Sequence, residues 1–311
     1  MAGVIVAVSG SSGLVGSALV TSLYAGGHEV RRLVRPPVRA GAGAATRGPG
    51  RADIPWDPGR GRLDPEHLAT CDAVVHLAGE NIAARPWSRA QKELLRDSRV
   101  PATALLASAL AALPRPPRVL VQASAIGYYG DRGDEILTET SLPGVGFLPE
   151  MCRAWEGASA PARAAGIRVV CARFGIILSA RGGALRKMLT PFRLGIGGVV
   201  GSGQQYWPWL QIEDAVGIVE YALGDASLDG PVNAVAPAPA TNREFTAALG
   251  RALRRPAVIP LPAFALRLAL GEMSSLLLES ARVVPERLRQ AGYRWRHPEL
   301  DEALRHAVAP R

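Results

Sequence analysis

The sequence predicts an α/β protein in which a doubly wound parallel sheet carries a smaller, mostly helical lobe. Three observations lead to this fold class. Short apolar runs alternate with segments of helical spacing over residues 1–178. A glycine-rich turn, VSGSSGLVG at residues 8–16, joins the first apolar run to the first helical segment. From Gly182 onward the alternation gives way to glycine-rich and then helical sequence.

The first strand–helix–strand unit lies within residues 4–34. The continuous β-branched and apolar run at 4–8 is typical of a strand covered on both faces. Apolar residues then recur at helical spacing over 14–23, until a Gly-Gly pair ends the helix. Residues 29–34 predict a second strand.

The middle of the chain repeats this alternation. A connection rich in Gly, Pro, Ala and Arg, from residue 36 to about 62, surrounds a short third strand near ADIPW. The sequence then predicts a fourth strand at 71–81, helices at 88–100 and 102–113, a fifth strand within 117–130 and a sixth within 166–178. Because ligands of such sheets bind beyond the carboxyl ends of the strands, we expect the site there.

The last third has a different pattern. Residues 182–209 are glycine-rich with clustered aromatic residues, which we interpret as a loop lobe over the sheet edge. A helix at 210–223 and a short strand at 230–237 return to the sheet, and Thr241 or Asn242 caps the next helix. The remaining sequence to Arg311 is helical and apolar.

The glycines of the turn, Gly10, Gly13 and Gly16, lie between a buried strand and the start of a helix. Backbone N–H groups and the helix dipole favour an anion at that place. Gly10 permits a tight turn, Gly13 the close approach of a pyrophosphate, and Gly16 close packing of helix on strand. The turn therefore predicts a dinucleotide site, although a glycine turn without a ligand has the same spacing.

The end of the second strand indicates which dinucleotide is bound. NAD sites usually place a carboxylate there, whereas this chain has RRLVRPP, with Arg31, Arg32 and Arg35 and no acid. A guanidinium suits a 2′-phosphate. We therefore expect NADP(H), with Arg35 as the contact; the alternative is that Arg35 is one more surface arginine.

Composition excludes several classes of function. The formal net charge is +9, but the arginines are scattered and no basic run is interleaved with aromatic residues, so we expect no nucleic acid partner. No apolar run is long enough to span a membrane. Cys71, Cys152 and Cys171 form no metal-binding spacing, so no metal is expected. The opening residues lack a basic segment before their apolar run, and the expected compartment is the cytoplasm.

Several stretches together resemble the extended short-chain dehydrogenase/reductase superfamily and, within it, the YfcH-like epimerase family branch. They are SGSSGLVGSALVTSLYAGGHEV, HLAGENI, KELLRDSRV, SAIGYYG, WEGA, GGALRKMLTPFRLGIGG, GSGQQYWPW and GPVNAVAP. The sequence at 254–304 resembles that branch's small C-terminal domain of unknown function. The resemblance implies an NADP-binding Rossmann domain at 1–178, returning at about 209–236, with a substrate lobe at 179–208 and 237–311.

The resemblance also assigns residues to the cofactor. It implies phosphate contacts along the glycine turn, the 2′-phosphate at Arg35, an adenosine and ribose wall after the fourth strand, and two further contacts from the KELLRDSR helix. The residues are Gly10, Ser12, Gly13, Leu14, Val15, Gly16, Arg35, Leu77, Ala78, Gly79, Glu93 and Arg99.

Active members of the superfamily use a serine or threonine and a Tyr-x-x-x-Lys pair, in which the lysine lowers the pKa of the tyrosine. Ser124 stands where the serine is expected. The Tyr-x-x-x-Lys pair is missing, because Ser88 precedes Lys92 and Gly183 precedes Lys187 at that spacing. On the helix that should carry the pair, the matching positions hold a leucine and a cysteine, at 148 and 152.

Three explanations for the missing Tyr-x-x-x-Lys pair remain open. Tyr128 or Tyr129 could act as the acid, although both could equally be packing residues. Lys187 could reach the pocket from the second lobe. The protein could also bind NADP(H) without the usual catalysis. We expect Gln204, Gln205 and Trp207 to border the substrate, although a packed lobe would explain the tryptophan as well.

The leading hypothesis is therefore an NADP(H)-dependent oxidoreductase or epimerase that acts on a small carbonyl or sugar-like substrate with atypical catalytic residues. The alternatives are a non-catalytic NADP(H)-binding sensor or scaffold, and a subunit that keeps the fold for stability alone. A homodimer through the helices at 88–113 and 147–159 is expected by analogy.

Overall fold

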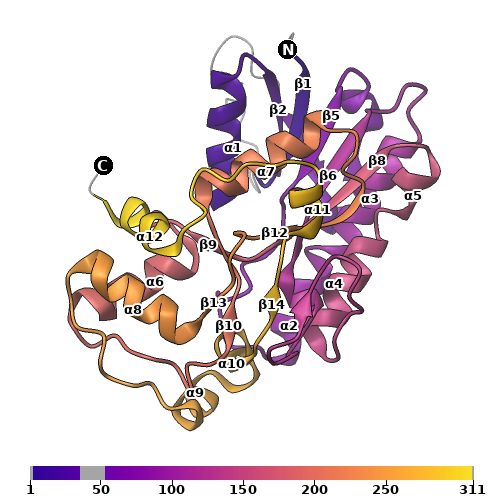
Figure 1. Ribbon diagram of the computed structural model, residues 1–311. Coiled ribbons are helices and arrows are strands. Elements are labelled where there is room, and N and C mark those ends of the chain that lie inside the picture. Colours follow the sequence, from indigo (N-terminus) through magenta and orange to yellow (C-terminus); the bar gives the residue numbers. More distant parts are fainter. Residues whose placement is uncertain (1–2, 36–52, 310–311) are drawn as a thin grey trace, which may run out of the picture.

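The computed structural model describes residues 3–35 and 53–309, and its centre is an eight-stranded sheet (Figure 1). Its order is β12-β8-β6-β5-β1-β2-β3-β4. All neighbours are parallel except the edge pair β3–β4. The strands are β1 Ile5–Ser9, β2 Glu29–Val34, β3 Ile54–Asp57, β4 Arg62–Leu63, β5 Ala73–His76, β6 Val119–Ala125, β8 Arg168–Phe174 and β12 Gly230–Ala234. The predicted fold class is confirmed.

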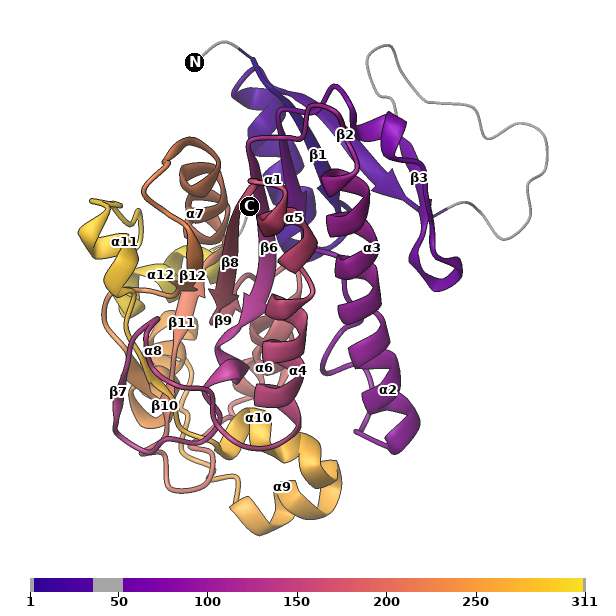
Figure 2. The same cartoon turned by 90° about the vertical axis from the view of Figure 1, so that its right-hand side faces the viewer.

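Helices cover both faces of the sheet, as the two-sided burial of the strands requires. On one face, α1 (Leu14–Ala25) and α7 (Ile212–Gly224) pack against Val6 and Val8 of β1. On the other, α3 (Val100–Ala111) and α5 (Ala160–Ala164) pack near Ala7 and Val74. Figure 2 shows α2 (Arg89–Asp97), α3, α4 (Phe147–Gly157) and α5 on this second side.

The second region has its own core, formed by helices and very short strand pairs. Its helices are α6 Gly183–Arg193, α8 Asn242–Leu253, α9 Ala263–Leu270, α10 Ser275–Leu278 and α12 Leu300–Val308. The strand pairs are β9 Ile176–Leu178 with β11 Trp209–Gln211, β10 Tyr206–Trp207 with β13 Ala240–Thr241, and β7 Ile136–Leu137 with β14 Arg282–Val283. Thr241 is the N-cap of α8 and forms a full capping box with Glu244.

The prediction of a loop lobe over 182–209 is wrong in its first half, because α6 occupies residues 183–193. Leu185, Leu189 and Phe192 recur at helical spacing and are buried in the second core. The flanking glycines and Pro191 conceal this periodicity. Pro191 lacks the N–H that would bond the carbonyl four residues earlier, and α6 ends two residues after it, at Arg193.

The C-terminal segment returns to the sheet after crossing the second region. After β14, the short helix α11 (Glu286–Gln290) packs against β12, with Leu288 buried in the first core. The Trp295 indole donates to the carbonyl of Val235 at 3.0 Å. No helix among the described residues is long and apolar enough to cross a membrane.

Candidate functional site

The glycine turn connects β1 to α1 and contacts the end of β5. Gly10 has φ +68°, and a Cβ there would lie 2.6 Å from the carbonyl carbon of Leu77. A Cβ on Gly16 would lie 2.1 Å from the carbonyl oxygen of Gly10. These two glycines are therefore required by the close contact of three backbone segments.

Gly13 differs from the other two because it is exposed, and its Cβ would meet only the Gly10 oxygen, at 3.2 Å. It is the N-cap of α1, and no side chain caps this helix. The first-turn N–H groups beside Ser12, Leu14 and Val15 therefore lack a side-chain acceptor, which is the arrangement that binds a pyrophosphate. The turn fits the phosphates of a dinucleotide.

The segment after β5 forms the next wall of the site. The Leu77 N–H donates to the Ser9 carbonyl at 3.3 Å, so this segment starts beside the glycine turn. A Cβ on Gly79 would lie 3.2 Å from the Arg99 guanidinium carbon. Arg99 is buried and donates to the carbonyls of Glu80 at 2.8 Å and Leu95 at 3.0 Å, and its Nε has no partner. Arg99 thus supports the wall that contains Leu77, Ala78 and Gly79.

Glu93, the other residue assigned to the cofactor from the KELLRDSR segment, lies on the exposed side of α2. Its carboxylate pairs with Arg89 at 3.1 Å. Among the described residues it shares no hydrogen bond or ion pair with the glycine turn. The structure therefore brings Arg99, but not Glu93, to the predicted cofactor wall.

The three arginines at the end of β2 have different partners. Arg31 pairs with Glu29, and Arg32 forms two 2.8 Å hydrogen bonds with Asp53. Arg35 is exposed and has no ion pair among the described residues. It borders a cavity of about 880 Å³, whose lining includes Trp56, Asp57, Arg60 and Arg62. Of the three, Arg35 is the one available to a 2′-phosphate.

Ser124, at the carboxyl end of β6, belongs to a buried network that the sequence reasoning missed. Its Oγ donates to Glu156 Oε1 at 2.6 Å. The Glu156 carboxylate accepts two 2.8 Å hydrogen bonds from Arg173 of β8. Burial opposes the charge on Arg173, but its hydrogen bonds with Glu156 and Tyr129 more than offset this and raise its pKa. Two features of the sequence could have indicated this network, because Glu156 lies in the WEGA motif and Arg173 lies at the end of a predicted strand.

The two adjacent tyrosines have different environments. Tyr129 is fully buried, and its hydroxyl accepts from Arg173 at 2.9 Å and lies 2.7 Å from Asn233 Oδ1. Burial raises its pKa to about 12. Tyr128 is half-buried, and its hydroxyl has no hydrogen bond among the described residues. The Arg173 guanidinium lies 3.5 Å from the centroid of its ring. The Tyr129 hydroxyl is therefore held by hydrogen bonds within the buried network, whereas the Tyr128 hydroxyl has none among the described residues.

The positions that hold Tyr and Lys in the superfamily face the same corner. A Cβ on Gly127, in the turn after β6, would lie 3.4 Å from Leu148 and 3.9 Å from Cys152 of α4. Burial, with a smaller effect of Glu156, raises the pKa of the Cys152 thiol to about 12. The leucine side chain has no exchangeable proton, and the buried thiol is a weaker acid than a free cysteine.

The residues assigned to substrate also differ in their burial and contacts. Gln205 and Trp207 are buried and donate to the Leu277 carbonyl at 3.0 and 3.2 Å, so in this structure both help to hold the second region together. Gln204 is exposed. Lys187 of α6 reaches across to the carbonyl of Ala83 at 2.6 Å, in the loop that follows the β5 wall.

A second polar chain lies beneath the site. His76 of β5 is fully buried, with Ser9 Oγ 2.6 Å from its Nδ1 and Thr103 Oγ1 3.0 Å from its Nε2. The Trp155 indole also donates to Thr103 at 3.0 Å. Burial lowers the pKa of His76 to about 4, so the ring is neutral. This chain ties the glycine turn to α4, which carries Glu156.

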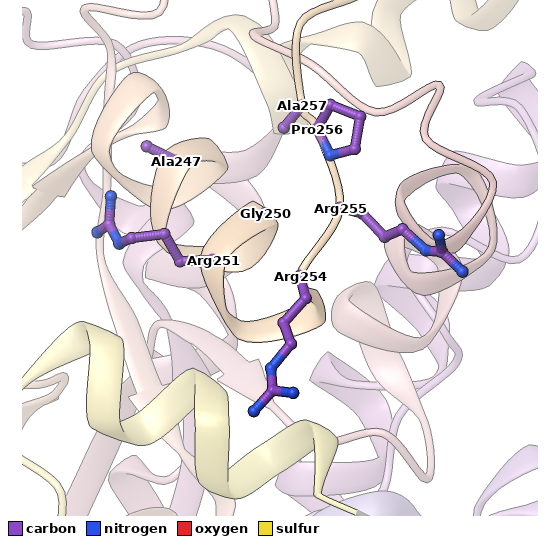
Figure 3. Close-up of a pocket in the computed structure, with 7 residues that line it drawn as sticks. All are labelled: Ala247, Gly250, Arg251, Arg254, Arg255, Pro256 and Ala257. Carbon is purple, nitrogen blue, oxygen red and sulfur yellow. The ribbon is translucent and has the colours of Figure 1, made fainter.

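Figure 3 shows a separate cavity of about 520 Å³ on α8 and the segment after it. Its charged side chains are Arg251, Arg254 and Arg255. Arg251 already pairs with Asp301 at 2.8 Å. No predicted site residue lines this cavity, and it lies away from the strand ends that carry the glycine turn and Ser124.

The structure combines a doubly wound sheet, an uncapped glycine turn after β1, and a serine at the end of β6, two strands away from β1. This combination defines a dinucleotide-binding protein of the short-chain dehydrogenase/reductase kind. The sequence model of the "NAD dependent epimerase/dehydratase family" matches residues 6–234, and a "domain of unknown function (DUF1731)" matches 261–307. The chain belongs to this family.

Relatives cover the chain from end to end. It is 44% identical to the epimerase family protein Mb2239 of Mycobacterium bovis over 309 residues, which are 99% of each chain. It is 43% identical to the epimerase family protein SDR39U1 of Bos taurus over 98% of this chain and 99% of that one. The crystal structure of human SDR39U1 (isoform2) with NADPH has a TM-score of 0.86 and 37% identity, covering 98% of this chain and 99% of that one.

Proposed function

We propose that the protein is an NADP(H)-dependent oxidoreductase or epimerase that acts on a small carbonyl or sugar-like substrate, with Tyr128 and Ser124 at the reacting oxygen. One observation carries this proposal. Arg173 joins the two residues, because its guanidinium lies over the Tyr128 ring and also holds the Glu156 carboxylate that accepts from Ser124. A positive charge thus lies over the Tyr128 ring, whose hydroxyl has no hydrogen bond in the described part of the chain, although the usual lysine is missing.

The cofactor assignment has separate support. The uncapped turn at Gly13 fits a pyrophosphate, and Arg35, which is exposed and has no ion pair among the described residues, offers a positive charge for a 2′-phosphate. The relative whose structure contains NADPH covers nearly the whole chain. NADP(H), when bound, supplies or accepts the hydride.

The chain's own residues would manage the proton. In the reductive direction the substrate carbon gains the hydride, and Tyr128 gives its phenolic proton to the substrate oxygen. The resulting phenolate is stabilised by Arg173, and solvent restores the proton. Ser124 donates a hydrogen bond to the same oxygen after its hydroxyl turns away from Glu156. Oxidation runs in the opposite sense, and an epimerase would use both directions in turn.

The test is turnover of NADPH with aldehydes, ketones and nucleotide sugars by matched variants. Tyr128→Phe and Ser124→Ala should each lower kcat/KM about 100-fold or more and leave NADPH affinity nearly unchanged. Ser108→Ala removes an exposed serine of α3 and should match the wild type. Wild-type turnover by both Tyr128→Phe and Ser124→Ala would reject the proposed roles.

The cofactor claim is tested by titrating NADPH and NADH in parallel, followed by tryptophan fluorescence or calorimetry. We expect NADPH to bind more tightly, and Arg35→Ala to weaken NADPH about 10- to 100-fold while leaving NADH unaffected. Equal binding of the two cofactors by the wild type would remove Arg35 from the site.

One observation favours a second function, a non-catalytic NADP(H)-binding sensor or scaffold. Leu148 and Cys152 occupy the corner where the proton-transferring pair would lie. Tight NADPH binding without turnover of any substrate class tested would favour this second function.

A further inference from the structure

A cluster of histidine and carboxylate groups lies outside the candidate site, where the C-terminal helix meets α7. Glu213 comes from the first turn of α7, His297 from the segment before α12, and His306 from α12 (Figure 1). Their ligand atoms all lie within 4.8 Å of one another. His297 Nε2 is 3.2 Å from Glu213 Oε2, and His306 Nε2 is 3.0 Å from Glu213 Oε1.

The fold holds these groups in place independently of their own contacts. Asp214, next to Glu213, accepts the backbone N–H groups of Arg296 at 2.7 Å and His297 at 3.0 Å. His297 is buried, and the imidazoles of His297 and His306 lie 4.5 Å apart between ring centroids. Two nitrogens and a carboxylate therefore converge from three separate stretches of chain.

The hydrogen bonding of His297 calls for a cation. Its Nε2 faces Glu213, and its Nδ1 lies 3.3 Å from Glu302 Oε1. A neutral imidazole has one N–H and cannot donate to two carboxylates. A metal ion on the Nε2 side would leave the Nδ1–H for Glu302, the carboxylate–histidine–metal arrangement of many zinc proteins.

We propose that Glu213, His297 and His306 bind Zn²⁺, with Glu302 orienting His297. Two histidines and one carboxylate are a common zinc donor set, which leaves a fourth position for water. Donors about 2.05 Å from a tetrahedral zinc ion lie about 3.3 Å apart. The separations here are close to this value, 3.2 Å from His297 to one Glu213 oxygen and 3.0 Å from His306 to the other.

Such an ion would join the C-terminal helix to α7. Because a preformed site is absent from the unfolded chain, the free energy of zinc binding would add to the stability of the folded state. The role we assign is structural, since no predicted cofactor or substrate residue belongs to the cluster.

The experiment uses the full chain, stripped with a chelator and titrated with Zn²⁺ alone by calorimetry at pH 7.5. We expect one Zn²⁺ per chain and a rise in Tm on zinc addition. His306→Gln and His297→Gln should abolish both. Glu302→Gln should weaken zinc binding about 10- to 100-fold. His67→Gln removes an exposed histidine far along the sequence and should behave as the wild type.

His306 is 40% exposed, so His306→Gln should fold even if His297→Gln does not, and far-ultraviolet circular dichroism of the metal-free variants checks this. Zinc affinity should also fall between pH 7.5 and 5.5, because protonated imidazole does not bind metal. Absence of zinc binding by the wild type, or equal binding by folded His306→Gln, would overturn the proposal.

Discussion

The glycine turn and the edge around Ser124 lie at the same end of the sheet, but they are built from different parts of the chain. In the turn, Gly10 and Gly16 act within seven residues, through the absence of side chains. The site around Ser124 is built from three elements, with Ser124 on β6, Glu156 on α4 and Arg173 on β8. These residues act through their polar side chains. The predicted phosphate site therefore follows from local backbone geometry, whereas the predicted catalytic site depends on tertiary packing.

This difference indicates how freely the amino-acid sequence of each site can change. A backbone cradle admits almost no substitution, because any Cβ at Gly10 or Gly16 meets backbone atoms. A side-chain network can exchange its members if charge and hydrogen bonds are conserved. Here Arg173 supplies positive charge near Tyr128, while Leu148 and Cys152 stand where the usual pair would be.

The largest expected effect is the loss of Arg173. Arg173→Met would leave the Glu156 carboxylate, only 13% exposed, without its partner. We expect the free energy of unfolding to fall by about 3–5 kcal/mol, as measured by urea denaturation. Arg89→Met removes a 95% exposed guanidinium and should change it by less than about 0.5 kcal/mol. A loss below about 1 kcal/mol at Arg173 would mean that the network does not stabilise this edge.

The second-largest expected effect concerns His76 and the polar chain that links the glycine turn to α4. His76 has a pKa lowered to about 4 in the folded state, against an unfolded value near 6.5. The unfolded chain therefore binds a proton that the folded chain does not, and stability falls as the pH drops from about 6.5 to 4. The contribution is about 3 kcal/mol. Urea denaturation across this range should show a shallower slope for His76→Asn; an unchanged slope would count against a neutral buried histidine.

A third comparison separates two glycines of one turn. Gly16→Ala would place its Cβ 2.1 Å from the Gly10 oxygen, and we expect it to lower the free energy of unfolding by about 1–3 kcal/mol. Gly13 has φ −72°, and an added Cβ would make one tight contact, 3.2 Å from the Gly10 oxygen, so Gly13→Ala should cost much less stability than Gly16→Ala. It should still weaken NADPH binding, because the added methyl group would lie at the N-terminus of α1, where we expect the pyrophosphate. Normal NADPH affinity in Gly13→Ala would exclude the turn as the phosphate site.

The smallest effect is expected at Glu93. Its carboxylate pairs with Arg89 on the exposed side of α2, so Glu93→Ala should change NADPH affinity less than about twofold in the same titration. The family resemblance implies a cofactor contact at this position. A tenfold loss of NADPH affinity would restore that contact and require α2 to approach the cofactor when it binds.

Local patterns account for what could be predicted. The run before Gly10, the helix after Gly13 and the strand at 29–34 each depend on near neighbours, so their types and approximate bounds were accessible. The pair of Glu156 with Arg173 depends on the orientation of α4 over β8, which no short window contains. Tyr128 and Tyr129 are adjacent and identical, and only the tertiary packing decides which hydroxyl is free. Two-residue strands such as β7 and β14 exist only through their pairing.

The position of β12 in the sheet has a consequence for biosynthesis. β8 pairs with β6 on one side and with β12 on the other, and β12 is made only after the chain has crossed the second region. A nascent chain that has emerged as far as Phe174 therefore exposes one hydrogen-bonding edge of β8, including Val170 and Ala172, until residues 230–234 leave the ribosome. Unpaired edges of this kind recruit other strands. Slow or interrupted translation between these two strands is thus the interval in which the protein is most exposed to aggregation and most dependent on chaperones.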